Sequence, residues 1–141
     1  AIINRLSEII FIQTVRTYAA QSNDSSSVFA ALRDEQISKV LGAIHEAPAE
    51  NWTVDSLARL AGVSRTVLAE RMKEVLGTSP IAYLTQWRME LAHEALVHDR
   101  DGIPEISESV GYQSLSAFTR TFKKHFGRGP GEVRRMKQAM A

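Results

Sequence analysis

Apolar residues recur every three or four positions along most of the chain, a spacing that places them on one face of an α-helix. We find no convincing strand pattern, and the sequence therefore predicts an all-α fold. Helices are predicted at residues 1–20, from about 34 to 48, at 54–61, 64–76, 80–98, 103–110 and 114–126, and from 130 to about 137.

Residues that supply hydrogen bonds or permit special backbone conformations mark the predicted helix ends. Side-chain oxygens of Asp34, Thr53, Ser64 and Ser114 can accept hydrogen bonds from the first free backbone N–H groups of the helices that follow. Glycine can take the left-handed conformation that ends a helix, and proline is favoured in the first turn of the next helix. The residues of these two kinds are Gly77, Gly127, Pro80 and Pro130.

The N-terminal part of the sequence differs from the rest. In residues 1–20, additional isoleucine and valine residues widen the apolar stripe beyond the surface that one packing partner would cover. We expect a segment upstream of the chain to have covered this helix; an ordinary packed helix of a complete domain is the alternative. Residues 21–27 are polar and without periodicity, which predicts a flexible linker. We therefore separate residues 1–33, as a helical linker or tail, from a domain at 34–138.

The pattern of residues 57–80 recurs at residues 106–130. The two copies are offset by 49 residues before the turn and by 50 after it, so the second turn has one extra residue. Each copy has a small residue where two helices would cross, a glycine in the turn, a capping serine and apolar residues that step by four. Two generic helical hairpins are the alternative, but these rarely share the serine, glycines and proline in register. The matched pairs are Leu57/Ile106, Ala58/Ser107, Ala61/Val110, Gly62/Gly111, Ser64/Ser114, Leu68/Phe118, Met72/Phe122, Lys73/Lys123, Leu76/Phe126, Gly77/Gly127 and Pro80/Pro130.

Composition and charge narrow the class of protein. A content of 44% hydrophobic and 23% charged residues is typical of a globular domain. No apolar run approaches the roughly 18 residues needed to span a bilayer, and residues 1–20 do not resemble a secretory signal. The absence of cysteine excludes disulfides and cysteine-ligated zinc and is compatible with a reducing cytoplasm. From Arg100 onward the chain has eight basic and four acidic residues, whereas residues 1–99 have nine basic and twelve acidic residues. The excess of basic residues favours phosphate contact by the C-terminal third.

Residues 34–135 resemble the DNA-binding region of the AraC/XylS-type bacterial transcription regulators. The resemblance is carried by LARLAGVSRTVLAERMKEVLGTSPIAYLTQWRMELAHEAL and by IPEISESVGYQSLSAFTRTFKKHFGRGP. Residues 1–33 look like the helical tail that, in one branch of the family, joins an effector-sensing domain to the DNA-binding part. The resemblance implies two helix-turn-helix subdomains, at about 54–76 and 103–126, joined by the long helix 80–98. It also implies sequence-specific binding near promoters.

The apolar stripe of the first recognition helix is predicted to face inward. The residues left outward are Arg65, Thr66, Ala69, Glu70 and Lys73. By resemblance, Thr66, Ala69 and Glu70 fall where this family commonly contacts bases, and Arg65 is a further candidate. Thr66 and Ala69 could meet a thymine methyl group, and Glu70 could accept a hydrogen bond from cytosine. Glu70 departs from the long basic or amide side chains often found there and would repel phosphate; an ion pair with Arg71 or Lys73 on a solvated face is the alternative.

In the second helix-turn-helix Phe118, Phe122 and Phe126 are predicted to face inward. The candidates for base contact are then Leu115, Ser116, Thr119 and Arg120. Arg120 is the best candidate for a bidentate contact to guanine, and contact with phosphate or water alone is the alternative. Backbone contacts supply affinity without sequence information, and the candidates for them are Thr53, Ser64, Lys73, Ser114, Lys123, Lys124, Arg128, Arg134 and Arg135. Helix capping alone would also account for the hydroxyl residues among them.

The length of the connecting helix is compatible with both recognition helices binding one DNA duplex. Helix 80–98 would be about 28 Å long, compared with roughly 34 Å for a turn of B-DNA. The two recognition helices could therefore enter successive major grooves, within a site of about one and a half to two turns. The expected partner is double-stranded promoter or operator DNA at the nucleoid of a bacterial cytoplasm. RNA polymerase and a second copy of the chain, held through residues 1–20, are further candidate partners.

A protein-interaction or dimerisation module without specific DNA readout is the alternative function. An enzyme is not predicted, because His45, His93, His98 and His125 share no metal-ligand spacing. The sequence also has neither a glycine-rich phosphate loop nor a nucleophile elbow. We therefore expect no catalytic residue, no metal and no cofactor.

Overall fold

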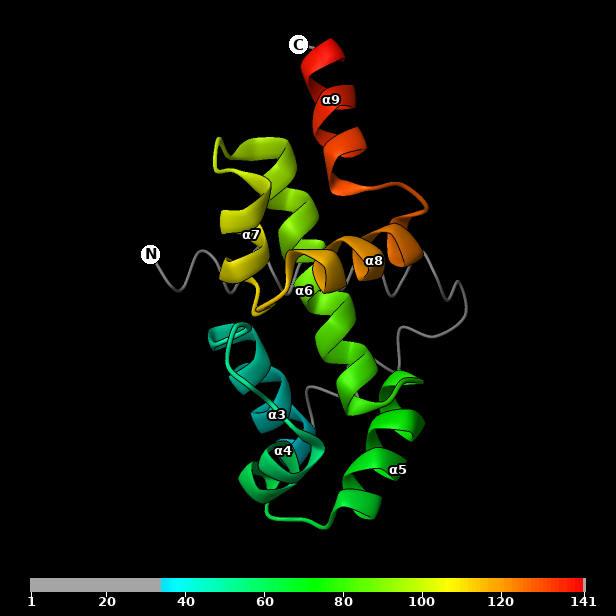
Figure 1. Cartoon of the computed structure of the whole chain (residues 1–141). Helices are drawn as coiled ribbons and strands as arrows, with labels where there is room; N and C mark the ends of the chain where they lie inside the picture. Colours follow the sequence, from blue (N-terminus) through cyan, green and yellow to red (C-terminus); the bar gives the residue numbers. More distant parts are fainter. Residues whose placement is uncertain (1–33, 141) are drawn as a thin grey trace. The chain divides into compact units, whose positions relative to one another are not determined.

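The computed structural model describes residues 34–140, in which every regular element is an α-helix (Figure 1). In chain order these are α3 (Glu35–Glu46), α4 (Val54–Ala61), α5 (Arg65–Leu76), α6 (Pro80–His98), α7 (Ile103–Ser109), α8 (Leu115–Phe126) and α9 (Pro130–Met140). The predicted all-α fold is confirmed for this part of the chain. The helix predicted at 1–20 and the linker predicted at 21–27 lie outside the described residues.

Three helix C-terminal ends differ from the prediction. Helix α3 ends at Glu46, with Ala47 as its C-cap, rather than at residue 48. Helix α7 ends at Ser109, one residue earlier than predicted, and Val110 forms its C-cap. Helix α9 continues through Met140 rather than ending near Lys137, because no glycine or proline follows Gly131 to interrupt it. The four predicted capping side chains all accept hydrogen bonds from backbone N–H groups of the helices that they precede, and they are Asp34, Thr53, Ser64 and Ser114.

The described helices form two compact units, each with one helix-turn-helix. The first unit comprises residues 34–47 and Trp52–Tyr83, and the second comprises Pro48–Asn51 and residues 84–140. Helix α6 gives its first residues to the first unit and the remainder to the second. Within residues 34–140 no helix has both the length and the apolar character needed to cross a membrane.

The core of the first unit is formed where α3, α4 and α5 pack against one another. Its fully buried side chains are Ile37, Val40, Ile44, Leu57, Leu68 and Met72. The apolar spacing of α3 predicts an inward side formed by Ile37, Val40, Leu41 and Ile44, and all of these except Leu41 are fully buried. The inward stripe predicted for α5 is observed at Leu68 and Met72. Ala58 is also buried, which agrees with the small residue predicted where two helices cross closely. Trp52 precedes α4, and its indole Nε1 donates a hydrogen bond to the carbonyl of Ala47 at 2.8 Å.

A histidine and a tyrosine are paired inside the first unit. His45 Nε2 lies 2.6 Å from the hydroxyl of Tyr83, which is itself buried. Burial lowers the pKa of His45 to about 4 and raises that of Tyr83, because a low-dielectric environment disfavours the charged form of each group. His45 is therefore neutral in the folded protein at neutral pH.

This pair makes the stability of the first unit depend on pH. The folded-state pKa of His45, about 4, lies below the value of 6.5 for an unperturbed histidine, so the unfolded chain binds this proton more readily. We expect the stabilising contribution of His45 to be complete above pH 6.5 and to decrease as the pH falls toward 4. The loss should reach about 2 kcal/mol by pH 5.

Urea denaturation at pH 7.5 and pH 5 would measure this loss. His45→Gln is the control, because its amide can occupy the position of Nε2 but does not titrate. Between pH 7.5 and pH 5, the free energy of unfolding of the variant should decrease by about 2 kcal/mol less than that of the wild type. Equal losses in the two proteins would contradict the assignment to His45.

The core of the second unit contains residues from α6, α7 and α8. Its buried members are Met89, Ala92, Leu96, Ile106, Val110, Phe118 and Phe122, with Leu91, Ala95, Ile103, Tyr112, Phe126 and Val133 partly buried around them. From its apolar spacing, the sequence predicts a core-facing side of α6 formed by Tyr83, Leu84, Trp87, Leu91, Ala95 and Leu96. This prediction omits Met89 and Ala92, which are fully buried. The structure corrects this, because α6 is buried on more than one side and a single stripe does not describe it. Trp87, also on α6, is 1% exposed.

Candidate nucleic-acid interface

The first helix-turn-helix consists of α4, a turn at Gly62 and α5. Gly62 has φ +73°, and the turn is closed by hydrogen bonds from the N–H of Gly62 to the carbonyl of Arg59 and from that of Val63 to Ala58. The side chain of Ser64 then accepts from the N–H of Val67 at 3.2 Å and begins α5. Leu68 and Met72 are fully buried and anchor α5, which fixes the outward face of this helix.

The outward face of α5 carries the predicted residues. Arg65, Thr66, Glu70 and Lys73 are exposed, and Ala69 is half-buried. Five such side chains on one face form a surface that can meet another molecule without a change in the core.

Two charged residues on this face differ in their contacts. Arg65 Nε lies 3.2 Å from Asp55 Oδ1, but both side chains are more than half exposed, so the pair is weak and can exchange for another partner. Among residues 34–140, Glu70 has no oppositely charged group within 4.0 Å. The predicted alternative pairing with Arg71 does not form, because Arg71 lies 3.7 Å from Asp34 instead. The carboxylate of Glu70 is thus left to solvent.

The second helix-turn-helix consists of α7, a turn at Gly111, Tyr112 and Gln113, and α8. Gly111 has φ +96°, and the N–H of Tyr112 donates to the carbonyl of Ser107 at 3.1 Å. The ring of Tyr112 packs edge-on against Phe118, with ring centroids 5.6 Å apart. Ser107 is 2% exposed, which agrees with the small residue predicted at the helix crossing. The turn and the packed core together fix the orientation of α8 relative to α7.

Helix α8 is anchored by its phenylalanines, as predicted. Phe118 and Phe122 are fully buried, and Phe126 is partly buried against them. Leu115, Ser116 and Arg120 are exposed on the opposite side, and Thr119 is half-buried. Lys123 and Lys124, both exposed, lie in the last turn, where positive charge is favoured by the helix dipole.

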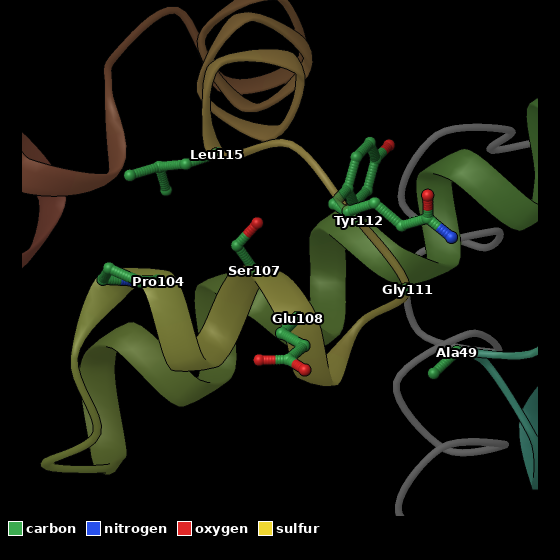
Figure 2. A pocket seen from close by; sticks show the side chains of 8 residues that line it. Ala49, Pro104, Ser107, Glu108, Gly111, Tyr112 and Leu115 are labelled. Atoms are coloured by element: carbon green, nitrogen blue, oxygen red, sulfur yellow. The ribbon is translucent and has the colours of Figure 1, made fainter.

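A cavity of about 520 Å³ lies between α7 and the first turn of α8. Figure 2 shows Pro104, Ser107 and Glu108 on α7 and Leu115 at the start of α8 around it. The remaining lining residues are Ala49, Gly111, Tyr112 and Gln113. The exposed carboxylate of Glu108 makes this cavity a poor site for phosphate. The sequence did not predict this cavity, since Ala49 in its wall is more than 50 residues away from the other lining residues, at 104–115.

Arg134, predicted to contact the DNA backbone, has an internal role. Its guanidinium donates hydrogen bonds to the carbonyls of Leu96 at 3.4 Å, Asp99 at 3.2 Å and Asp101. These carbonyls lie at and just beyond the end of α6, so Arg134 attaches α9 to the end of that helix. Contact of Arg134 with phosphate stays a prediction. Arg128 lies against the sulfur of Met136, and Arg135 is exposed.

Arg88 is a residue that the sequence did not single out. On α6, its Nε and one Nη donate to the carbonyls of Pro48 and Glu50, each at 2.8 Å, and its Cζ lies 5.8 Å from the ring centroid of Tyr112. Partial burial lowers the pKa of this guanidinium. Arg88 thereby holds Pro48–Asn51 beside the turn at Gly111. No sequence motif indicates the contact, because the partners are backbone atoms about 40 residues away in the chain.

Comparison with known proteins gives the family. A family model described as a helix-turn-helix domain matches residues 57–136, which include the first helix-turn-helix from Leu57 onward and all of the second. A solved transcriptional regulator from Chromobacterium violaceum, described as having an AraC-type DNA-binding domain, is 27% identical with a TM-score of 0.69. The alignment covers 76% of this chain and 96% of that one. The chain belongs to the AraC/XylS-type family. This is a family of transcription-regulator DNA-binding domains and not of enzymes.

A curated relative and a further solved structure are also similar to this chain. The transcriptional regulator AlkR of Acinetobacter baylyi is 38% identical over 133 residues, which are 94% of this chain and 44% of AlkR. The DNA-binding domain of AdpA, solved in complex with a target DNA, shares the fold with a TM-score of 0.70 at 24% identity. That alignment covers 73% of this chain and 93% of the AdpA domain. The chain spans about half the length of the curated relatives that it matches.

Proposed function

We propose that this chain is the DNA-binding part of a transcription regulator and that α5 and α8 each enter the major groove of a promoter or operator. The observation that supports this most strongly is the repeated construction. In each helix-turn-helix a fully buried stripe holds the second helix, and the residues in its N-terminal half that could meet base edges face solvent. The length of α6, 19 residues or about 28 Å, is compatible with successive grooves.

The two recognition helices are proposed to have different roles. Helix α8 carries Arg120 for guanine, together with Lys123 and Lys124 for the phosphate backbone. Beside the basic Arg65 and Lys73, helix α5 offers small or acidic groups, among which the solvent-facing carboxylate of Glu70 could accept a hydrogen bond from cytosine. We therefore propose that α8 supplies most of the affinity and α5 mainly discriminates between sequences.

The proposal extends to partners and location as the family suggests them. We propose that the regulator acts at the bacterial nucleoid, in the cytoplasm, and that it contacts RNA polymerase at the promoter. Residues 1–20 are proposed to support a homodimer, and residues 1–33 to link residues 34–138 to an effector-sensing domain. No catalytic step is proposed for this chain.

The main test measures the footprint of the chain and its dependence on salt. A selection of bound sequences from a random DNA pool gives the site, and footprinting on that site should show protection in two segments about one helical turn apart. The affinity should fall steeply between about 50 and 200 mM salt. Protection of a single segment would contradict the proposal that α5 and α8 both enter the major groove. Weak, salt-independent binding would instead favour a protein-interaction module.

Arg120→Ala tests base reading by α8. We expect the variant to lose roughly 1–3 kcal/mol of binding free energy on the selected site and to lose preference at one base position. The side chain of Arg120 is exposed and makes no hydrogen bond or ion pair within residues 34–140, so folding should be unchanged. Lys124→Ala is the matched control on the same helix, and it should weaken binding to the selected site and to random DNA equally. An equal loss on both DNAs for Arg120→Ala would assign that residue to phosphate.

A further inference from the structure

The exposed face of α8 presents two short rows of side chains. Residues four apart lie next to each other on a helix, so Leu115 and Thr119 form one row and Ser116 and Arg120 form another. Leu115 is 44% exposed although it is a large apolar residue in the first turn of the helix. The rows are adjacent and differ in chemistry, one ending in a guanidinium and the other containing leucine and threonine.

The hydroxyl groups on this face are already occupied. Thr119 Oγ1 donates a hydrogen bond to the carbonyl of Leu115 at 2.8 Å. Ser116 Oγ lies 2.9 Å from the hydroxyl of Ser114, which also accepts from the N–H of Ala117. Because the hydroxyl hydrogen of Thr119 is bound to the helix backbone, Thr119 cannot donate it to a base. Its Oγ1 can still accept a hydrogen bond, and its γ-methyl is the apolar group that it can offer. The Leu115 and Thr119 row therefore presents apolar groups and no free hydroxyl hydrogen.

We propose that Leu115 and Thr119 read the C5-methyl groups of thymine, next to the guanine that Arg120 contacts. The C5-methyl of thymine is the apolar group that the major groove presents, so an apolar row can distinguish thymine from cytosine there. Contact with the methyl also removes the exposed surface of Leu115 from water. The half-site of α8 is then a guanine with one or two thymines within the neighbouring base pairs. This inference rests on the proposed function, since it assigns a base to the same face of α8.

Replacement of thymine by deoxyuridine tests the inference, because it removes the methyl group and keeps every hydrogen-bonding atom. Starting from the selected site, each thymine in the segment protected by α8 is replaced singly, and the affinity of the full chain is measured. At one or two positions the affinity should fall about three- to tenfold. No effect at any position of this segment, with salt-dependent binding intact, would overturn the inference and leave the proposed function standing.

Two variants assign the effect to Thr119. Thr119→Ser keeps the hydroxyl and removes the methyl, so it should bind the thymine and deoxyuridine sites with the same affinity at one position. Thr119→Val keeps a methyl and removes the hydroxyl, so it should retain the wild-type discrimination. Discrimination that survives in Thr119→Ser and is lost in Thr119→Val would overturn the role of the methyl.

Leu115→Ala separates the two members of the row. The change lies on an exposed side chain, so the thermal unfolding temperature should stay close to that of the wild type. Leu115→Ala should lose the discrimination between thymine and deoxyuridine at one position, and this position should differ from the one affected by Thr119→Ser. If the wild type shows no salt-dependent binding to any DNA, the proposed function fails, and this inference fails with it.

Discussion

Phe122→Ala is expected to lower the free energy of unfolding of the second unit by about 3–5 kcal/mol. Phe122 is fully buried, and its ring centroid lies 4.6 Å from that of Phe126 and 5.8 Å from that of Phe118. The ring of His93 is stacked on it, with centroids 6.3 Å apart. Removal of the ring leaves a cavity that neighbours on rigid helices fill only in part. Urea denaturation followed by circular dichroism measures the loss.

Two variants on the same helix make this result interpretable. Phe126→Ala removes the same ring from a partly buried position and should cost less than Phe122→Ala. Lys123→Ala changes an exposed neighbour and should stay within about 0.5 kcal/mol of the wild type. A loss below about 1 kcal/mol for Phe122→Ala would mean that α8 is not anchored by this ring. The recognition face opposite the ring would then lack the support proposed for it.

Gly111→Ala is expected to destabilise the second unit by roughly 3 kcal/mol or more. The positive φ of Gly111, +96°, is one that residues with a side chain adopt at a cost. In addition, a Cβ at Gly111 would come within 2.9 Å of Arg88 Nη2 and 3.0 Å of the Cα of Ala49. Arg88 cannot move aside freely, because its guanidinium is bound to the carbonyls of Pro48 and Glu50. Thermal and urea unfolding measure the effect.

Gly62→Ala is the matched control, since Gly62 holds the equivalent turn in the first unit. Its φ is +73°, but a Cβ there would meet no atom within 4 Å. This variant should therefore show only the backbone cost of about 1–2 kcal/mol. Equal losses at the two glycines would contradict the steric part of the argument. The double variant Gly111→Ala with Arg88→Ala should lose less than the two single changes together, because the clash and the bonds share one side chain.

The helix caps and buried stripes of the helix-turn-helix units could be predicted because they depend on residues that are close together in the sequence. A capping side chain binds an N–H group three residues away, as Ser64 does with Val67, so the relevant partners appear together in the sequence. Residues that step by four, such as Phe118 and Phe122, must share one helix face whatever the surrounding fold. For this reason the buried stripes of α5 and α8 were predicted correctly. Most of the candidate residues opposite them are exposed as predicted, and Ala69 and Thr119 are half-buried.

Long-range contacts could not be predicted in the same way. The carbonyls bound by Arg134 are more than 30 residues away in the sequence, and backbone carbonyls carry no side-chain signal. The sequence therefore indicates for Arg134 only the contact with phosphate, which stays a prediction, and not its bonds to these carbonyls. Met89 and Ala92 were missed for a related reason, since α6 is buried on several sides and its periodicity is weak. Which bases the exposed residues contact also depends on DNA and stays a prediction.

The two tryptophans of the chain are distributed one to each compact unit. Trp52 belongs to the first unit and bonds to the carbonyl of Ala47, whereas Trp87 on α6 belongs to the second and is almost fully buried. Fluorescence therefore provides a built-in optical probe for each unit. In Trp87→Phe the emission reports the first unit alone, and in Trp52→Phe it reports the second. Whether the two units melt together or in sequence can then be followed without any attached label.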